Sequence, residues 1–106
     1  MEKENRKRIL SAAAKLFSRH GFETVSVQDI CDQAEITKPT LYYYFKSKQN
    51  LYDQLLVEAI DLMDLYMQST TRADLSFCER LERMFVEMLR YVEDNEDYTR
   101  FIMRIY

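Results

Sequence analysis

The stretch SVQDICDQAEITKPTLYYYF, residues 26–45, predicts two short helices in immediate succession. The hydroxyl of Ser26 can accept a hydrogen bond from a free backbone N–H, and Asp29 stands where the acid of a capping box would. Thr37 is a good N-cap for the second helix, and Pro39 is tolerated there because first-turn N–H groups have no helical partner anyway. Only two residues remain as the turn between the helices. This is the spacing of a helix-turn-helix motif.

The rest of the chain also has helical periodicity. Residues 4–20 carry apolar side chains at i, i+3, i+4 and i+7, and Gly21 follows as a left-handed stop. Ser47 is expected to cap a fourth helix that runs to about residue 68, and Ser76 begins a capping box for a fifth. The acidic run EDNED, residues 93–97, is expected to break that helix before a sixth. With one Gly and one Pro in 106 residues, the expected fold class is all-α.

Composition excludes several classes of protein. A length of 106 residues suits one small domain, and 47% of the residues are apolar. No apolar run approaches the roughly 18 residues of a membrane span, and no signal peptide follows the charged start MEKENRKRIL. We therefore expect a cytoplasmic protein without membrane association. The cysteines lack metal spacing, and no paired carboxylates, Gly-rich phosphate loop or nucleophile triad is present, so neither a cofactor nor enzymatic activity is expected.

Charge is divided unevenly along the chain. Residues 1–50 carry nine Lys/Arg and six Asp/Glu, a balance of +3, whereas residues 51–106 carry six Arg and twelve Asp/Glu, a balance of −6. All the lysines lie at or before Lys48. A basic first half on an acidic chain suggests a local binding site for a polyanion, although ordinary decoration of helix surfaces gives the same pattern.

The second helix of the motif has the residue types of a helix that enters the major groove of DNA. Its first turn would present Thr37, Lys38 and Thr40 at the end whose dipole favours phosphate. Lys38 can reach O6 and N7 of guanine, and Pro39 offers an apolar surface to a thymine methyl group. Base contacts by these residues would carry the sequence information.

Three consecutive tyrosines continue this helix. Successive residues turn by about 100°, so the three rings cannot all face one core. Tyr42 lies on the side of Lys38 and is expected to touch bases or the adjacent sugar. Tyr43 and Tyr44 are expected to diverge toward the phosphates on the two sides of the groove, while Leu41 faces inward.

Three further residues are expected to assist. Lys48, at the start of the fourth helix, would hold a phosphate, and Ser26 at the start of the motif would hold another. Gln28 lies on the outer face of the first helix of the motif, where it can reach a base edge.

Residues 24–56, TVSVQDICDQAEITKPTLYYYFKSKQNLYDQLL, resemble the DNA-binding domain of the TetR/AcrR family of transcriptional regulators. The family pattern includes the ending LYYYFKSK, and AAAKLFSRHGF at residues 12–22 also fits it. The likeness covers about residues 3–63. Two positions depart from the usual pattern, because Glu35 stands where the family often has Gly and Pro39 replaces a frequent Gly or Ala.

The resemblance implies a homodimeric regulator, most often a repressor, that binds a pseudo-palindromic operator in double-stranded DNA and responds to a small molecule. Residues 3–63 would form the DNA-binding domain, with the helix-turn-helix at about 26–45. Residues 64–106 would begin a longer C-terminal domain for effector binding and dimerisation. The DNA contacts that the resemblance implies are Ser26, Gln28, Thr37, Lys38, Pro39, Thr40, Tyr42, Tyr43, Tyr44 and Lys48.

A stripe of Met and aromatic residues in the second half has two interpretations. It can line an effector pocket, or it can pack a core, which is the commoner use of such side chains. Two alternatives to a DNA-binding regulator also stay open: a helical protein–protein interaction module, and a small-molecule sensor without DNA binding. The candidate pocket residues are Met63, Tyr66, Met67, Phe85, Met88 and Tyr98.

Overall fold

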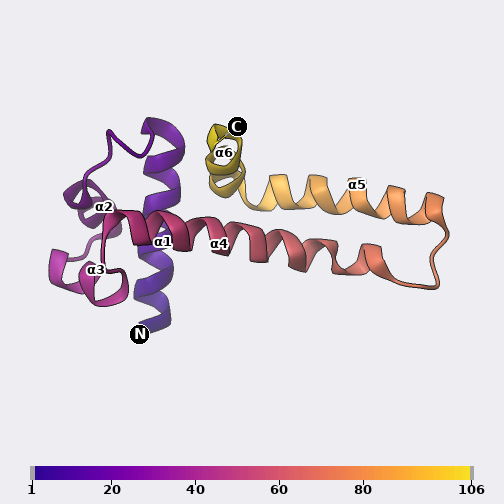
Figure 1. The fold of residues 1–106 in the computed structure, drawn as a ribbon, viewed down its shortest axis with the longest axis horizontal. Coiled ribbons are helices and arrows are strands. Elements are labelled where there is room, and N and C mark those ends of the chain that lie inside the picture. Colours follow the sequence, from indigo (N-terminus) through magenta and orange to yellow (C-terminus); the bar gives the residue numbers. More distant parts are fainter. Residues whose placement is uncertain (1, 106) are drawn as a thin grey trace.

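The computed structural model describes residues 2–105, and within this range the chain is all-α, as expected. The helices follow one another through short turns (Figure 1). Their bounds are α1 (Glu2–His20), α2 (Val27–Ala34), α3 (Lys38–Tyr44), α4 (Lys48–Met67), the 3-10 helix η1 (Gln68–Thr71), α5 (Phe77–Asp94) and α6 (Glu96–Ile105).

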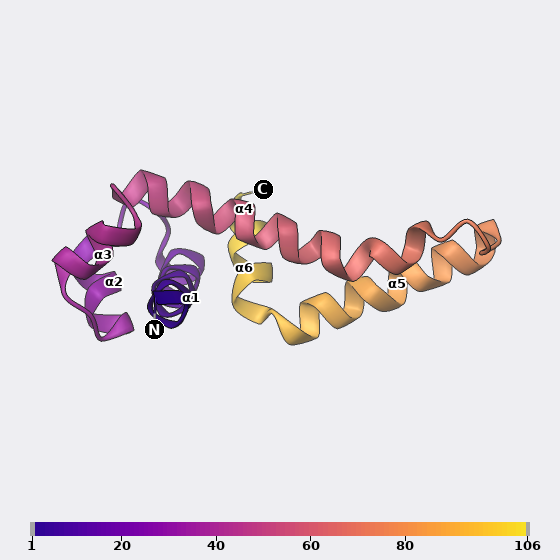
Figure 2. The same cartoon turned by 90° about the horizontal axis from the view of Figure 1, so that it is seen from below.

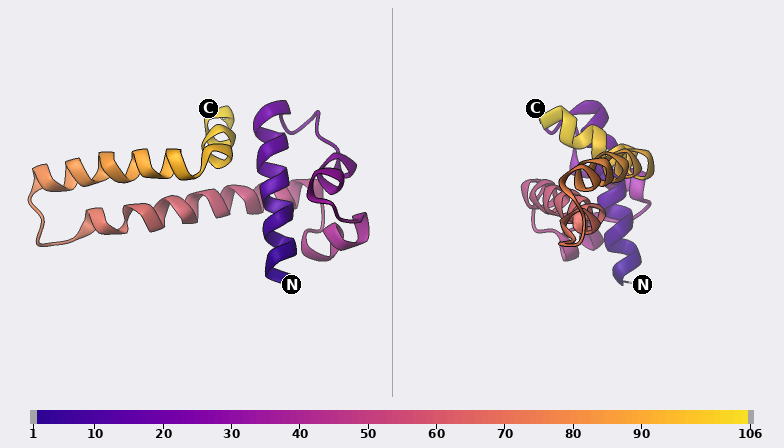
Figure 3. Two further views of the ribbon diagram at one scale, coloured as in Figure 1. Left: turned by 180° about the vertical axis from the view of Figure 1, so that it is seen from behind. Right: turned by 90° about the vertical axis from the view of Figure 1, so that its right-hand side faces the viewer.

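The molecule has a compact end and a long arm. Helices α1, α2 and α3 gather at one end, while α4 leads away from them and α5 returns antiparallel beside it (Figures 1 and 2). The chain then turns into α6, which lies against α1 (Figure 3). This arrangement gives an elongated shape with extents of 51 × 29 × 19 Å.

The expected caps form at the starts of the helices. The Asp29 N–H donates to Ser26 Oγ at 3.0 Å, and the Ser26 N–H donates back to Asp29 Oδ2 at 3.0 Å, which completes the capping box of α2. The backbone hydrogen bond from Ser26 lowers the pKa of Asp29. Thr37 and Ser47 cap α3 and α4, and Ser76 forms a second capping box at α5. Local hydrogen bonding therefore sets where these helices begin.

The expected break at residues 93–97 is wrong in its extent. Helix α5 continues to Asp94, α6 begins at Glu96, and Asn95 alone makes the corner. The Asn95 N–H donates to the carbonyl of Tyr91 at 2.9 Å, and the carbonyl of Asn95 accepts from the Thr99 N–H at 2.9 Å. One residue thus completes the end of α5 and the start of α6, and the acids after it suit the positive end of the α6 dipole.

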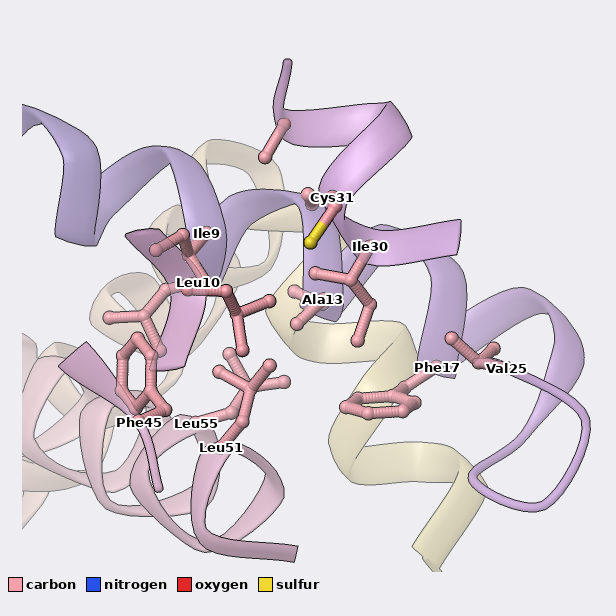
Figure 4. Packing of buried hydrophobic residues seen from close by; sticks show 14 of the residues in the cluster. Ile9, Leu10, Ala13, Phe17, Val25, Ile30, Cys31, Phe45, Leu51 and Leu55 are labelled. Atoms are coloured by element: carbon pink, nitrogen blue, oxygen red, sulfur yellow. The ribbon is translucent and has the colours of Figure 1, made fainter. Parts of the chain in front are cut away.

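The main hydrophobic core lies at the compact end, where α1, α2, α3, α4 and α6 meet (Figure 4). Phe17 of α1 is fully buried there, and so are Ile30 of α2 and Leu41 of α3. Phe101 of α6 is 2% exposed and belongs to the same cluster. A residue beyond position 63 therefore completes the core of the helix-turn-helix end.

The turn between α2 and α3 contains a strained residue. Glu35 has φ 59° and ψ 48°, which is the left-handed conformation, and its N–H caps the end of α2 by donating to carbonyls of that helix. Glu35 therefore adopts the left-handed backbone conformation that a glycine would adopt more easily. For a residue with a Cβ, this conformation costs about 1 kcal/mol of stability. The carboxylate of Glu35 lies 3.5 Å from Arg8 Nη2 in an exposed ion pair.

We expect Glu35→Gly to raise the free energy of unfolding by about 1 kcal/mol, because relief of left-handed strain outweighs an exposed ion pair that contributes less than about 0.5 kcal/mol. Urea unfolding followed by circular dichroism measures the change. Glu35→Ala removes the same ion pair and keeps the strain, so it is expected to show no gain. A loss of stability in the glycine variant would mean that the pair with Arg8 dominates.

Candidate nucleic-acid interface

Helix α3 is fixed from behind by two fully buried side chains. Leu41 is 0% exposed and Phe45, which caps the helix, is 1% exposed. Because these two residues are four apart, they anchor one face of α3 and turn the opposite face to solvent. Lys38 and Pro39 lie exposed in the first turn of α3.

The two threonines of α3 are joined to each other. Thr37 Oγ1 and Thr40 Oγ1 lie 2.9 Å apart in a hydrogen bond, and Thr37 Oγ1 also accepts from the Thr40 N–H at 3.4 Å. Thr37 is exposed, whereas Thr40 is half-buried. The two hydroxyls are therefore held next to each other at the N-terminal end of α3.

The three tyrosines differ in exposure. Tyr43 is 71% exposed and Tyr42 is 46% exposed, while Tyr44 is half-buried against the core. The rings of Tyr43 and Tyr44 meet edge to face with centroids 5.0 Å apart, so the expectation that they diverge is wrong. Tyr44 packs against the core, and the ring of Tyr43 packs against the ring of Tyr44. Perpendicular aromatic pairs of this kind are favourable.

Lys48 has a structural contact that the sequence analysis did not foresee. Its Nζ donates to the carbonyl oxygens of Phe22 at 2.7 Å and Val25 at 3.0 Å, and lies 4.1 Å from the centroid of the Phe22 ring. The ammonium thereby ties the start of α4 to the segment between α1 and α2. An ammonium group has three N–H bonds, so a phosphate contact through the third stays a prediction.

The candidate residues of α2 lie on its outer side. The Ser26 hydroxyl accepts the capping hydrogen bond from Asp29 and keeps its own proton available for donation. Gln28 is exposed, and its Nε2 donates to Asp32 Oδ1 at 2.8 Å. The side-chain amide has a second N–H and an acceptor oxygen, so a base contact by Gln28 stays a prediction.

Lys46 was missed by the sequence analysis. It directly follows Phe45, is exposed, and has its backbone N–H bonded to Asn50 Oδ1 at 3.2 Å. An exposed lysine two residues after α3 is a candidate phosphate contact. The repeated lysine in KSK, residues 46–48, was the available signal.

The candidate effector residues fall into different surroundings. Tyr66 of α4 contacts α5: its O–H donates to Asp94 Oδ2 at 2.7 Å, and its ring meets that of Tyr91 edge to face with centroids 5.4 Å apart. Tyr98 packs against the core of the compact end, and burial raises its pKa to about 12. Met63 and Met67 are half-buried. The effector pocket stays a prediction.

The apolar stripe of α5 is turned to solvent. Phe85 is 61% exposed, Met88 is 44% exposed and Phe77 is 75% exposed. Leu81, Met84 and Val92 are exposed as well, and in the part of the chain that the structure describes Tyr91 is the buried residue of α5. These side chains of α5 therefore do not pack in a core, although core packing is the commoner use of such a stripe.

Residues 2–105 show neither a metal-binding cluster nor a membrane-spanning helix. No group of three or more His, Cys, Asp or Glu there is placed to hold a metal ion. None of the described helices combines the length and the apolar character that crossing a bilayer requires.

A short helix that is anchored by two buried residues and follows a capped helix and a tight turn forms a helix-turn-helix motif. Residues 9–55 match the family model described as bacterial regulatory proteins, tetR family. The chain belongs to this family of transcriptional regulators.

Known relatives agree with this assignment. The chain is 30% identical over 105 residues to the HTH-type transcriptional repressor KstR of Mycobacterium tuberculosis. This alignment covers 99% of this chain and 48% of KstR. It is 42% identical over 55 residues to the uncharacterized HTH-type transcriptional regulator YdgC of Bacillus subtilis, with 52% of this chain and 28% of the relative covered. The chain thus spans about half of the length of KstR and a smaller part of YdgC.

Solved structures share the fold. A TetR-like transcriptional regulator from Rhodococcus sp. RHA1 superposes with a TM-score of 0.89 at 28% identity, covering 94% of this chain and 55% of that one. A gamma-butyrolactone receptor described as an ArpA-like protein gives a TM-score of 0.82 at 26% identity. The superposition covers 94% of this chain and 50% of the receptor chain. Both likenesses extend over α1 to α6 and not the helix-turn-helix alone.

We expect Lys48→Met to lower the free energy of unfolding by about 2 kcal/mol, because two carbonyl oxygens lose a charged donor. Lys46→Met is the matched control: its exposed side chain should leave stability within about 0.5 kcal/mol of the original. Urea unfolding of both variants measures the difference. Equal stability of the two would show that the ammonium of Lys48 does not hold the segment between α1 and α2.

Proposed function

We propose that this protein is a transcriptional regulator that binds an operator in double-stranded DNA, with α3 in the major groove. The observation that carries the proposal is that Lys38, Pro39 and Tyr42 of α3 are exposed, while Leu41 and Phe45 anchor the helix in the core. A helix held in this way can approach base edges without disturbing its own core.

The proposed contacts divide into base readers and phosphate contacts. Lys38, Pro39, Tyr42 and Gln28 face base edges, with Lys38 directed to guanine. The hydroxyl and ammonium groups around them fix the register on the phosphates. The phosphate set is Ser26, Thr37, Thr40, Tyr43, Tyr44 and Lys48, to which the exposed Lys46 is added.

We further propose a ligand-responsive repressor that acts as a homodimer in the cytoplasm. KstR is named a repressor, and the gamma-butyrolactone receptor is named for a small molecule, which supports these finer statements. Residues 3–63 form the proposed DNA-binding domain, which we call the head, and residues 64–106 form the proposed start of the effector and dimerisation domain. Two heads would meet half-sites one helical turn of DNA apart, about 34–36 Å.

The proposed regulation uses α4, which runs from the head into the arm beside α5. An effector bound in the second domain would favour one tilt of α4 over another and so alter the separation of the two heads. Such coupling requires that the effector binds the two arrangements with different affinity. The candidate pocket comprises Met63, Tyr66, Met67, Phe85, Met88 and Tyr98.

The direct test is selection from a pool of randomised duplexes, followed by titration of the selected sequence at several salt concentrations. A DNA reader is expected to enrich one sequence and to lose affinity steeply with salt, because each phosphate contact adds about −0.9 to the slope of log K against log salt. Absence of enrichment together with salt-independent binding would refute DNA recognition and favour a protein–protein interaction module.

Two lysine variants separate the two kinds of contact. Lys46→Ala is expected to weaken binding to all sequences equally and to reduce the salt slope by about 0.9. Lys38→Ala is expected to relax the preference at one base pair, with a loss of discrimination of about 1–3 kcal/mol. Competition titrations with single-base operator variants measure both effects. Identical behaviour of the two variants would contradict the assignment of Lys38 to a base.

A further inference from the structure

Four aromatic rings from separate parts of the chain meet at the junction of the head and α6. Tyr52 of α4 stands at the centre, with its ring centroid 5.2 Å from Phe22, 5.6 Å from Phe17 and 5.2 Å from Phe101. Each of these three pairs is tilted by 66° to 78°, close to edge-to-face. Such pairs add directional attraction to simple apolar burial.

The cluster continues into the segment between α1 and α2. Phe22 lies in that segment, and its ring faces the ammonium of Lys48 at 4.1 Å. The same ammonium binds the carbonyls of Phe22 and Val25. Val25 immediately precedes Ser26, the N-cap of α2 and a proposed phosphate contact. A contiguous set of contacts therefore links α6 to the start of α2.

A second residue of α6 touches the same segment. Arg104 Nη1 donates to the carbonyl of Ser18 at 3.5 Å, in the last turn of α1. Its guanidinium also covers Gly21, since a Cβ added there would lie 3.1 Å from Arg104 Nη2. Gly21 has φ 83°, so this residue both reverses the chain and leaves room for the arginine.

We propose that Phe101 is a positioning residue for the DNA-binding head: by packing on Tyr52 it holds Phe22 and, through Lys48, the N-terminus of α2 in place. The proposal rests on the proposed function and adds to it a link that does not require α4 to tilt. Withdrawal of α6 would release residues 21–26 directly. Phe101 would thus help to hold Ser26, a proposed phosphate contact, in place.

The test compares Phe101→Ala with Tyr91→Ala. Tyr91 is also buried, at 4% exposure, but it contacts Tyr66 and the carbonyl of Ala59 on the arm, away from residues 21–26. Amide hydrogen exchange by NMR reports local opening, and titration with the selected operator reports binding. Both measurements are made where circular dichroism shows each variant of the 106-residue chain to be folded.

Within residues 22–28, the amide of Ser26 donates to Asp29 Oδ2 and therefore reports local opening. Phe101→Ala is expected to speed exchange of this amide and to weaken operator binding, each by about tenfold, which corresponds to about 1.4 kcal/mol. Tyr91→Ala, despite its loss of overall stability, is expected to leave both within about twofold of the original chain. Equal effects of the two variants on residues 22–28 would overturn the proposal, because Phe101 would then only contribute to general stability.

Phe101→Leu covers the case in which the alanine variant does not fold. Leucine keeps most of the buried apolar volume but removes the ring contacts, and it is expected to speed exchange at residues 22–28 about threefold or more while the exchange of α5 is unchanged. Unchanged exchange at residues 22–28 would refute the role of Phe101. If the original chain binds no DNA, the proposed function fails, while the exchange measurements still decide this inference.

Discussion

The structure depends on the burial of one face of two very short helices. Helices α2 and α3 have eight and seven residues, below the roughly 12–15 that an isolated helix needs in water. Ile30 and Cys31 hold α2 against the core, and Leu41 holds α3. Because this anchoring occupies only the inner face, α3 can present polar and aromatic side chains on its outer face without losing its fold.

The same constraint explains the run of three tyrosines. Of the three tyrosines, Tyr44 is the one that packs against the core. Tyr43 then packs across the ring of Tyr44, while Tyr42 remains available on the side of Lys38. The aromatics therefore form a partly supported surface, and their placement comes from packing and not from helix geometry alone.

The head and the arm are connected more closely than the order of the segments along the chain implies. Phe101 lies in the head core although it follows a hairpin of α4 and α5 that extends away from it. Lys48 joins the same region through two backbone carbonyls, so one side chain helps to fix α4 and the start of α2 together. Recognition of DNA would thus depend on residues well outside the helix-turn-helix.

Local hydrogen bonding and periodicity predicted where α2 to α5 begin, because the caps at Ser26, Thr37, Ser47 and Ser76 act within a few residues. The corner at Asn95 was not predicted, because the acidic run around it was interpreted as a longer break. The candidate DNA-binding residues also followed from the motif and its resemblance to a family. The partners of Lys48, the meeting of Tyr43 with Tyr44 and the burial of Phe101 were decided by the tertiary structure. These depend on contacts between residues distant along the chain or on competition for space in the core, and a sequence pattern does not report either.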